Sequence, residues 1–336
     1  MTDFKEVMGK IFKGCGCMSI GFCVLLVIVA LFADDEESTE VTEETTQKTE
    51  QVEKKDSVIV NEPLEGDPYK ELDELIGLGS VKEEVRSLAN FVKLQKQREA
   101  QGLKTAKVSY HLVFYGSPGT GKTTVARIVG RIYKDLGVLK KGHLVETDRS
   151  GLVAEYVGQT AVKTNKIIDK ALDGVLFIDE AYALAQGGSE DYGKEAIATL
   201  LKRMEDNRDR LVVILAGYTD EIEQFINSNP GLRSRFNRYI CFPDYSAEEL
   251  FEIFLLQTQK NDYILSEEAG DCLKKHFEAK IEQKSKDFGN ARYVRNLFEK
   301  TIEIQANRLA SVPQLTNEMM AELILIDVQQ ALNIVY

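Results

Sequence analysis

The fold is decided by one stretch of sequence, Gly116-Ser117-Pro118-Gly119-Thr120-Gly121-Lys122-Thr123-Thr124. An apolar run at 112–115 precedes it, and a run with helical character at 125–129 follows it. The order strand, glycine-rich loop, helix is the setting in which the pattern G-x-x-x-x-G-K-[ST] binds a polyphosphate. The sequence therefore predicts a phosphate-binding loop at 116–124, and the rest of the chain is interpreted relative to it.

Each part of this loop has a role that its residue type can fill. Gly116, Gly119 and Gly121 allow the backbone to turn its N–H groups toward one point without a Cβ clash. These groups and the positive end of the following helix favour a bound anion. Lys122 is expected to reach the β- and γ-phosphates, and the Thr123 hydroxyl to coordinate Mg²⁺. The predicted loop is completed by Ser117, Pro118, Thr120 and Thr124.

The net charge of −12 is concentrated in one part of the 336-residue chain. Residues 34–67 contain thirteen acidic residues and three lysines, so the remainder is nearly neutral. Proteins that bind nucleic acid usually present a basic face. This balance argues against a general basic field for nucleic acid, although it leaves open a local basic channel. The five cysteines show neither a disulfide framework nor a zinc-binding spacing, which favours a reducing compartment for the body.

Residues 14–33 are twenty uncharged residues, the last sixteen of them strongly apolar. At about 1.5 Å per residue, a helix of this length matches the thickness of a bilayer's hydrocarbon layer. We predict a transmembrane anchor at 14–33, after a short N-terminal segment at 1–13. By the positive-inside rule, the lysines before this segment place the N-terminus in the cytoplasm. The body would then lie on the other side of the membrane. Cleavage of the segment as a signal peptide would export the body too. Because the body needs a cytoplasmic nucleotide, we expect it on the cytoplasmic side.

Residues 34–67 are rich in Glu, Asp, Thr, Lys and Gln, with almost nothing apolar before 58–60. Such a composition cannot bury enough surface to offset the entropy cost of ordering. We predict an acidic disordered linker, and a plain spacer is favoured over an acidic docking site.

From 68 to 244, strand patterns alternate with helix patterns. This alternation is typical of an α/β layer with a parallel sheet, and we assign 68–244 to one α/β domain. The predicted strands are 112–115, 144–145, 175–178 and 211–216. The predicted helices are 81–102, with Ser80 as N-cap, then 162–172 and 192–206.

From 246 onward the pattern is helical only, which predicts a smaller α-helical lid domain at 245–336. Its predicted helices are 246–260, 266–279, 289–309 and 316–333.

Asp179 and Glu180 follow the apolar run 175–178 directly. A charge at the end of a buried strand is unfavourable unless a cation lies beside it. Mg²⁺ held by Thr123 and Asp179 supplies that cation. Glu180 is then placed to orient and deprotonate the attacking water.

Two arginine-containing stretches remain. Arg233, Arg235 and Arg238 lie in 231–238. Arg292 and Arg295 lie in 289–295, three residues apart and so on one helix face. Phosphoryl transfer uses an extra cation at the transition state, often donated by another subunit. We therefore expect 231–238 to act on a phosphate, although a surface basic cluster is an equal alternative. We expect Arg292 and Arg295 to contact the same phosphates from the lid.

Residues from about 70 to 310 resemble the AAA+ ATPases, in particular the group with the red-type rubisco activases (CbbX-like) and stage V sporulation protein K. The motifs that carry this resemblance are LIGL at 75–78, GSPGTGKTT at 116–124, EYVG at 155–158, FIDEA at 177–181, GGSEDYGKEA at 187–196, LAGYTDE at 215–221, NPGLRSRFN at 229–237 and GNARYVRN at 289–296.

The resemblance implies a role for each motif, with ATP and Mg²⁺ as the bound ligands. Ile76 and Gly77 would border the adenine, Gly119 to Thr123 would form Walker A, and Asp179 with Glu180 would form Walker B. Thr219, or alternatively Tyr218, would be sensor 1, where many AAA+ proteins have Asn. The implied arginine fingers are Arg233 and Arg235, and the implied sensor 2 is Arg292.

Arginine fingers that reach a neighbouring ATP imply a homo-oligomeric ring, which we expect to be a hexamer. Tyr156, Val157 and Gly158 resemble the pore loop that grips a threaded polypeptide; without the resemblance, a core tyrosine beside a turn is the simpler interpretation. Residues 187–193 would form a second pore loop.

These expectations combine into a membrane-tethered AAA+ motor that hydrolyses ATP and pulls protein clients through a pore. The alternatives are a nucleic-acid motor or clamp-loader-like ATPase, and a nucleotide-dependent membrane scaffold. The hydrophobic segment and its linker depart from the relatives and do not favour a soluble rubisco-activase role.

Overall fold

The computed structural model describes residues 58–335, apart from 64, 106–107, 157, 187–191 and 286–287. The predicted N-terminal segment, the anchor at 14–33 and most of the linker at 34–67 lie outside these residues. Within the described part, every helix is too short or too polar to cross a bilayer.

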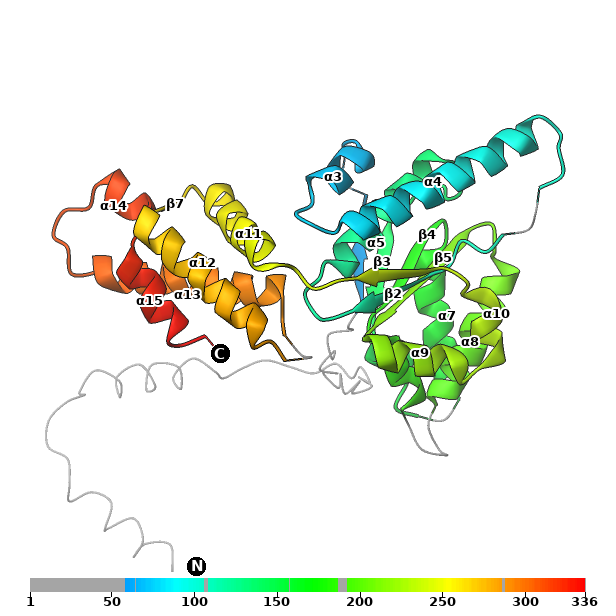
Figure 1. Ribbon diagram of the computed structural model, residues 1–336. Coiled ribbons are helices and arrows are strands. Elements are labelled where there is room, and N and C mark those ends of the chain that lie inside the picture. Colours follow the sequence, from blue (N-terminus) through cyan, green and yellow to red (C-terminus); the bar gives the residue numbers. More distant parts are fainter. Residues whose placement is uncertain are drawn as a thin grey trace, which may run out of the picture. The chain divides into compact units, whose positions relative to one another are not determined.

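A six-stranded sheet in the order β1-β3-β4-β5-β2-β6 forms the centre of the first domain (Figure 1). All neighbouring strands are parallel except β1, which pairs antiparallel with β3. The mostly parallel sheet and its covering helices confirm the predicted fold class. The strands are β1 (Ile59–Asn61), β2 (Leu112–Gly116), β3 (Leu144–Thr147), β4 (Gly174–Ile178), β5 (Leu211–Gly217) and β6 (Tyr239–Phe242).

Strands β4 and β5 are buried along their whole length. Their side chains alternate between two hydrophobic cores, with Val175 and Phe177 in one and Leu176 and Ile178 in the other. Burial of each such side chain contributes about 1.5–3 kcal/mol, so both faces of the sheet must be covered by helices. Because both faces of these strands are buried, their sequences are continuous apolar runs.

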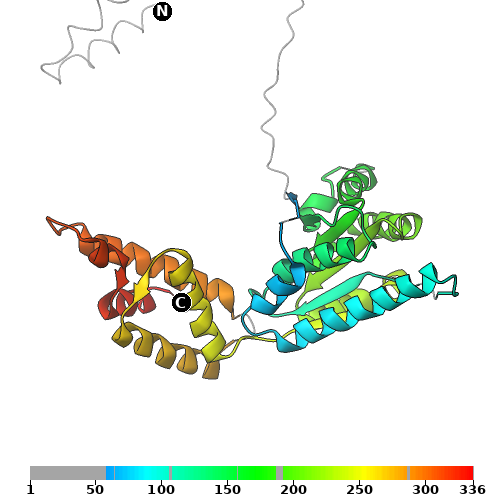
Figure 2. The ribbon, with the colours of Figure 1, turned by 90° about the horizontal axis from the view of Figure 1, so that it is seen from above.

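Two groups of helices cover these faces. The first core contains residues of α4 (Gly79–Ala100) and α5 (Lys122–Asp135), and α3 (Pro68–Glu74) packs there too. Figure 2 shows the long helix α4, in cyan, running beside the sheet. The helices of the second core are α7 (Thr160–Ala171), α8 (Gly193–Asp206), α9 (Thr219–Asn227) and α10 (Pro230–Arg235). Two short helices connect these elements, α6 (Arg149–Leu152) and the 3₁₀ helix η1 (Ala181–Ala185).

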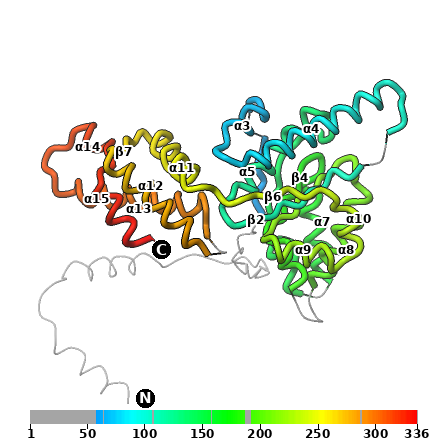
Figure 3. The backbone as a smooth tube through the Cα atoms, viewed as in Figure 1, coloured from blue at the N-terminus to red at the C-terminus, as the bar shows by residue number. Residues whose placement is uncertain are grey.

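The chain passes from β6 into a helical lid (Figure 3). The lid helices are α11 (Ala247–Lys260), α12 (Glu267–Glu282), α13 (Ala291–Leu309), α14 (Asn317–Ala321) and α15 (Leu325–Leu332). Two short strands, β7 (Ile264–Leu265) and β8 (Glu322–Leu323), pair in parallel between them.

Three details of the prediction are wrong. The expected single helix at 316–333 is broken, because 322–323 pairs with β7 and the buried Asp327 accepts a hydrogen bond from the Ile324 N–H at 3.1 Å as α15 begins. Ser80 does not cap α4; the helix begins at Gly79, after Leu78 in the left-handed region. Residues 59–61 of the predicted disordered linker form the edge strand β1.

Candidate functional site

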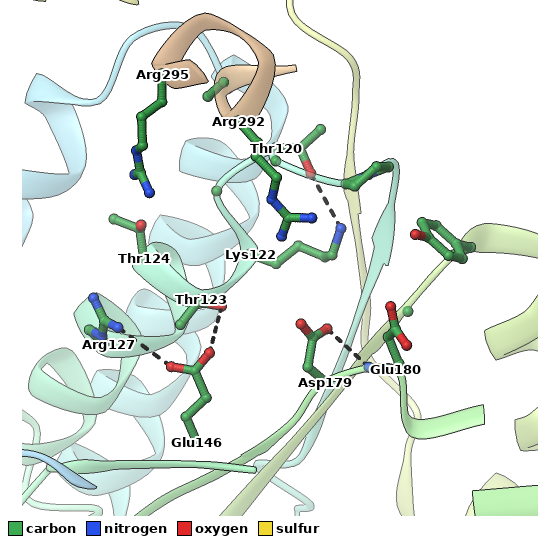
Figure 4. A pocket seen from close by; sticks show the side chains of 16 residues that line it. Thr120, Lys122, Thr123, Thr124, Arg127, Glu146, Asp179, Glu180, Arg292 and Arg295 are labelled. Carbon is green, nitrogen blue, oxygen red and sulfur yellow. Dashed lines mark hydrogen bonds and ion pairs between the residues drawn. The ribbon is translucent and has the colours of Figure 1, made fainter. Parts of the chain in front are cut away.

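A cavity of about 420 Å³ lies where β2, β4 and β5 end (Figure 4). Ligands of open parallel sheets bind outside the carboxyl ends of the strands. The lining residues come from the glycine-rich loop, the start of α5, three strand ends and the start of α13. They are Pro118, Gly119, Thr120, Gly121, Lys122, Thr123, Thr124, Arg127, Glu146, Asp179, Glu180, Gly217, Tyr218, Ala291, Arg292 and Arg295.

The glycine-rich loop is closely packed at two of its glycines. Gly116 has φ +144°, and a Cβ there would lie 2.2 Å from the Phe242 carbonyl oxygen. Gly119 has φ +71°, and a Cβ there would lie 2.1 Å from the Gly289 carbonyl oxygen in the lid. Only glycine fits these positions, so the loop keeps its concave backbone and α5 begins directly at Lys122.

Lys122 is the cation of this loop. Its Nζ donates to the carbonyl oxygens of Gly116 at 2.9 Å and Ser117 at 2.8 Å. Burial lowers the pKa of Lys122 to about 8; the nearby Asp179 carboxylate raises it and the Arg292 guanidinium lowers it further. A bound polyphosphate would favour the charged ammonium.

Asp179 and Glu180 line the cavity at the end of β4. Asp179 is partly buried and Glu180 is exposed. The Asp179 carboxylate accepts the Glu180 N–H at 3.0 Å, and Glu180 has φ 45°, a left-handed conformation that costs a non-glycine residue about 1–3 kcal/mol. The sharp turn directs the two neighbouring carboxylates to different positions in the cavity, as Figure 4 shows.

Two charged lining residues were not predicted from the sequence, Glu146 and Arg127. Glu146 at the end of β3 lies 3.5 Å from the Thr123 hydroxyl and 3.5 Å from an Arg127 guanidinium nitrogen. Burial raises the pKa of Glu146, and Arg127 opposes this shift. An acidic residue at the end of a predicted strand next to the phosphate loop was the available signal.

The lid contributes Arg292 and Arg295 to the cavity. They lie three residues apart near the start of α13, so they share one face of that helix. Figure 4 shows Arg292 extending toward Lys122. The position of Arg292 is therefore compatible with the predicted contact between this residue of the lid and the phosphates.

The site residues fit a nucleoside triphosphate with Mg²⁺. Thr123 and Asp179 offer hard oxygen ligands in a cavity whose loop backbone can surround phosphates. Mg²⁺ is usually held by one or two carboxylates plus substrate phosphates rather than by a full protein cage. The described residues contain no cluster of three or more His, Cys, Asp or Glu side chains suited to a metal.

Comparisons with known proteins agree with this site. A model described as "ATPase family associated with various cellular activities (AAA)" matches residues 112–244, and an AAA lid domain model matches residues 246–335. Stage V sporulation protein K of Bacillus subtilis is 47% identical over 241 residues, which cover 71% of this chain and 75% of that protein. This chain belongs to the AAA ATPase family.

Other relatives of this AAA ATPase are similar over the same extent. Protein CbbX of Cereibacter sphaeroides is 47% identical over 242 residues, covering 71% of this chain and 78% of that protein. The crystal structure of the FIGL-1 AAA domain in complex with ADP aligns with a TM-score of 0.57 over 84% of this chain and 88% of that one. At 16% identity the latter likeness concerns the fold alone. The predicted resemblance to the group of CbbX and stage V sporulation protein K is confirmed.

Several predicted site residues of this AAA ATPase lie outside the described cavity lining. Gly77 packs on Glu249 of α11, where an added Cβ would meet the carboxylate at 2.3 Å, and Ile76 packs on the hydrophobic core. Of the two sensor-1 alternatives, Tyr218 lines the cavity, whereas Thr219 is the first residue of α9 and is not among the lining residues.

The arginines of α10 also lie outside the described cavity lining. Arg233 is exposed. Arg235 is partly buried and lies 3.7 Å from the Glu205 carboxylate of α8. Neither is among the residues that line the cavity of its own chain.

Tyr156 lies in the connection between α6 and α7, and 67% of its surface is exposed. The simpler interpretation, a tyrosine of the core, is wrong. Gly158 has φ +76°, and nothing lies within 4 Å of a Cβ built there. Val157 and most of the predicted second pore loop, 187–191, lie outside the described residues.

Proposed function

We propose that this AAA ATPase hydrolyses ATP in a homo-oligomeric ring, expected to be a hexamer, and uses the energy to remodel protein clients. One observation carries the proposal. The phosphate loop with Lys122, the β4 carboxylates and Arg292 of the lid converge on one cavity. Each supplies a component that phosphoryl transfer needs, namely a phosphate cradle, a metal ligand with a base, and an added cation.

The chemistry then follows from the residues. The loop N–H groups and Lys122 hold the phosphates, and Thr123 and Asp179 would hold Mg²⁺, which neutralises charge on the phosphates when bound. Glu180 accepts a proton from the attacking water. Arg292 faces the developing charge from the lid. We propose that a second chain donates a further cation to the transition state, as in other phosphoryl-transfer enzymes.

Arg233 and Arg235 are the proposed donors of that cation. They lie on a helix away from their own cavity, so a role in catalysis requires that they reach the site of an adjacent subunit. A ring arrangement supplies such a neighbour to every subunit. The exposed position of Arg233 favours it as the residue that makes the contact.

Client pulling is proposed from the loop around Tyr156. A large aromatic side chain exposed at a loop tip offers apolar contact area to a polypeptide. We propose that this loop, including Val157 and Gly158, grips an unfolded client. We also propose that residues 14–33 anchor the chain to a membrane, with the ATPase on the cytoplasmic side.

The test measures nucleotide binding and phosphate release by the purified full-length protein in detergent or bilayer discs. Retention of Mg²⁺·ATP and release of phosphate at a rate that rises with oligomerisation support the proposal. Salt-sensitive stimulation by DNA would instead support a nucleic-acid motor. Tight ATP binding without hydrolysis would support a membrane scaffold, and loss of both binding and hydrolysis would refute an ATPase.

A further inference from the structure

Asn290 joins three parts of the molecule. It is fully buried, and its Nδ2 donates to the carbonyl oxygen of Pro118 at 3.2 Å in the phosphate loop and to Asp244 Oδ1 at 2.9 Å. Its Oδ1 accepts the Tyr245 N–H at 3.1 Å. Asp244 and Tyr245 lie between β6 and α11, where the chain enters the lid. One side chain therefore links the phosphate loop, the connection between the domains and the start of α13.

The backbone of Asn290 is unusual as well. Its φ of 46° and ψ of −125° define a conformation that residues other than glycine seldom adopt. Such a conformation persists only where the surroundings fix it. The next residue, Ala291, donates its N–H to the Gly119 carbonyl oxygen at 3.2 Å. The start of α13 is thus held to the phosphate loop through backbone and side chain together.

Asp244 is a charged member of this cluster. Its carboxylate accepts from Lys284 at 2.6 Å and from Asn290 at 2.9 Å. Although burial raises the pKa of Asp244, hydrogen bonds from Lys284, Ser117 and Asn290 hold it below its ordinary value. The same carboxylate favours the charged form of Lys122. Asp244 is therefore electrostatically coupled to the phosphate-binding lysine.

Arg292 follows Asn290 by two residues and lines the cavity. A long side chain on a helix can contact a phosphate reproducibly only if the helix start is fixed. The contacts of Asn290 provide that restraint, and they end on the loop that the phosphates occupy.

We propose that Asn290 and Asp244 form a polar latch that fixes Arg292 in the cavity and couples the phosphate loop to the position of the lid. The proposal rests on the ATPase function above and deepens it. Both are positioning residues, since they act through Arg292. The latch predicts that loss of Asn290 lowers kcat with little change in KM for ATP.

The first test is a double-mutant cycle in the full-length protein. Asn290→Gly keeps the backbone conformation and removes the side chain. We expect it to lower kcat at least tenfold while KM changes less than threefold. The double variant Asn290→Gly/Arg292→Ala should have a kcat within twofold of Arg292→Ala alone, because both changes remove one interaction. The latch is overturned if the kcat losses of the two single variants multiply in the double variant. It is also overturned if Asn290→Gly alone lowers kcat by twofold or less.

The second test is a rescue. Asn290→Asp places a carboxylate against Asp244 and should lower kcat at least tenfold. Adding Asp244→Asn lets the new amide donate to the new carboxylate, which restores this contact but leaves the Pro118 carbonyl oxygen without its donor. We therefore expect kcat to recover in part, by about twofold to fivefold. No recovery at all would show that the contact between positions 290 and 244 is not part of the latch, whereas full recovery would show that the bond to the Pro118 carbonyl oxygen is not.

The control is Asn333→Gly, an exposed asparagine at the end of α15 in the same lid, which should keep kcat within twofold. A wild-type chain that neither binds nor hydrolyses ATP would refute the proposed function and the latch with it. A wild-type chain that hydrolyses ATP while Asn290→Gly keeps its kcat refutes the latch alone.

Discussion

Two pairs of arginines in this AAA ATPase lie in different surroundings. Arg292 and Arg295 line the phosphate cavity from the start of α13. Arg233 and Arg235 lie on α10, where Arg233 is exposed and Arg235 is 3.7 Å from Glu205. All four belong to short motifs in the sequence, yet the fold brings only one pair to the cavity of its own chain.

This difference shows that a sequence motif does not reveal whether an arginine acts on the nucleotide of its own chain or on that of another chain. The α13 arginines are fixed by the lid of the same chain, so we expect them to act in cis. The α10 arginines can act on a phosphate only when a second chain approaches. Four experiments test this division, in order of expected effect.

The largest effect is expected for Arg233→Ala. A donated arginine contributes about 10³–10⁵ in kcat in known phosphoryl-transfer enzymes, so phosphate release should fall by about 10³ or more on that scale. ATP binding should persist, because the cavity of the altered chain is unchanged. Phosphate release and nucleotide retention are measured on the same preparation.

Mixing of inactive variants separates action in trans from action in cis. In a mixed ring, an Arg233→Ala subunit supplies an intact Glu180, and a neighbouring Glu180→Gln subunit supplies an intact Arg233. Sites between such neighbours are complete, so activity should return. A mixture of Arg292→Ala and Glu180→Gln subunits creates no complete site and should remain inactive. The division is wrong if both mixtures behave alike.

The next effect is expected for Glu180→Gln. A general base contributes about 10²–10⁴ in rate, and the amide keeps the shape of the side chain without accepting the proton. Hydrolysis should fall by that factor while ATP remains bound. Glu223→Gln, a change at an exposed carboxylate on α9, is the matched control and should behave as the wild type. Normal turnover in Glu180→Gln would remove Glu180 from its proposed role.

The cavity also shows which parts of the site could be predicted from the sequence. The phosphate loop and the carboxylates after β4 could be predicted, because local patterns specify them: glycines that permit one backbone and an apolar run that ends in acids. The contact between Glu146 and Arg127 could not be predicted, since it depends on the place of β3 beside β4 in the sheet. Asn290 lies within a recognised motif, but its contacts with Pro118 and Asp244 span 172 and 46 residues of sequence.

The fold shows the same limit. The structure contains all four predicted strands. Each carries an apolar run whose side chains are buried on both faces of the sheet or on one of them. Strand β1 has three residues in an acidic context and exists by pairing with β3. Strand β6 alternates buried and exposed residues over four positions, too short a pattern to separate from a loop. Short elements are specified by their neighbours rather than by their own residues.

The third experiment uses pH to sharpen the division between the arginines. The pKa of Lys122 is about 8, lowered first by burial and also by Arg292. A bound triphosphate favours the charged lysine, so affinity for ATP should be constant below pH 8 and fall by up to about tenfold per unit above it. Arg292→Ala should move this fall to higher pH, because one source of the lowered pKa is removed. Arg233→Ala should leave its midpoint unchanged. Equilibrium binding from pH 6.5 to 9.5 checks both expectations; a common shift in both variants would contradict the division.

The smallest effect on ATP turnover is expected for Tyr156→Ala, a change at a site that lies, like α10, outside the described cavity lining. The exposed side chain is not required for the fold, so basal phosphate release should stay within about twofold, as for other surface substitutions. Pulling an unfolded polypeptide requires grip at the loop, so remodelling of a client should be lost. Tyr156→Phe keeps the aromatic surface and should retain remodelling. A client captured in the ATP-bound Glu180→Gln protein provides the substrate for this assay. If Tyr156→Ala remodels that client at the wild-type rate, the loop does not grip it, whereas parallel loss of hydrolysis would place Tyr156 in the ATP cycle rather than on the client.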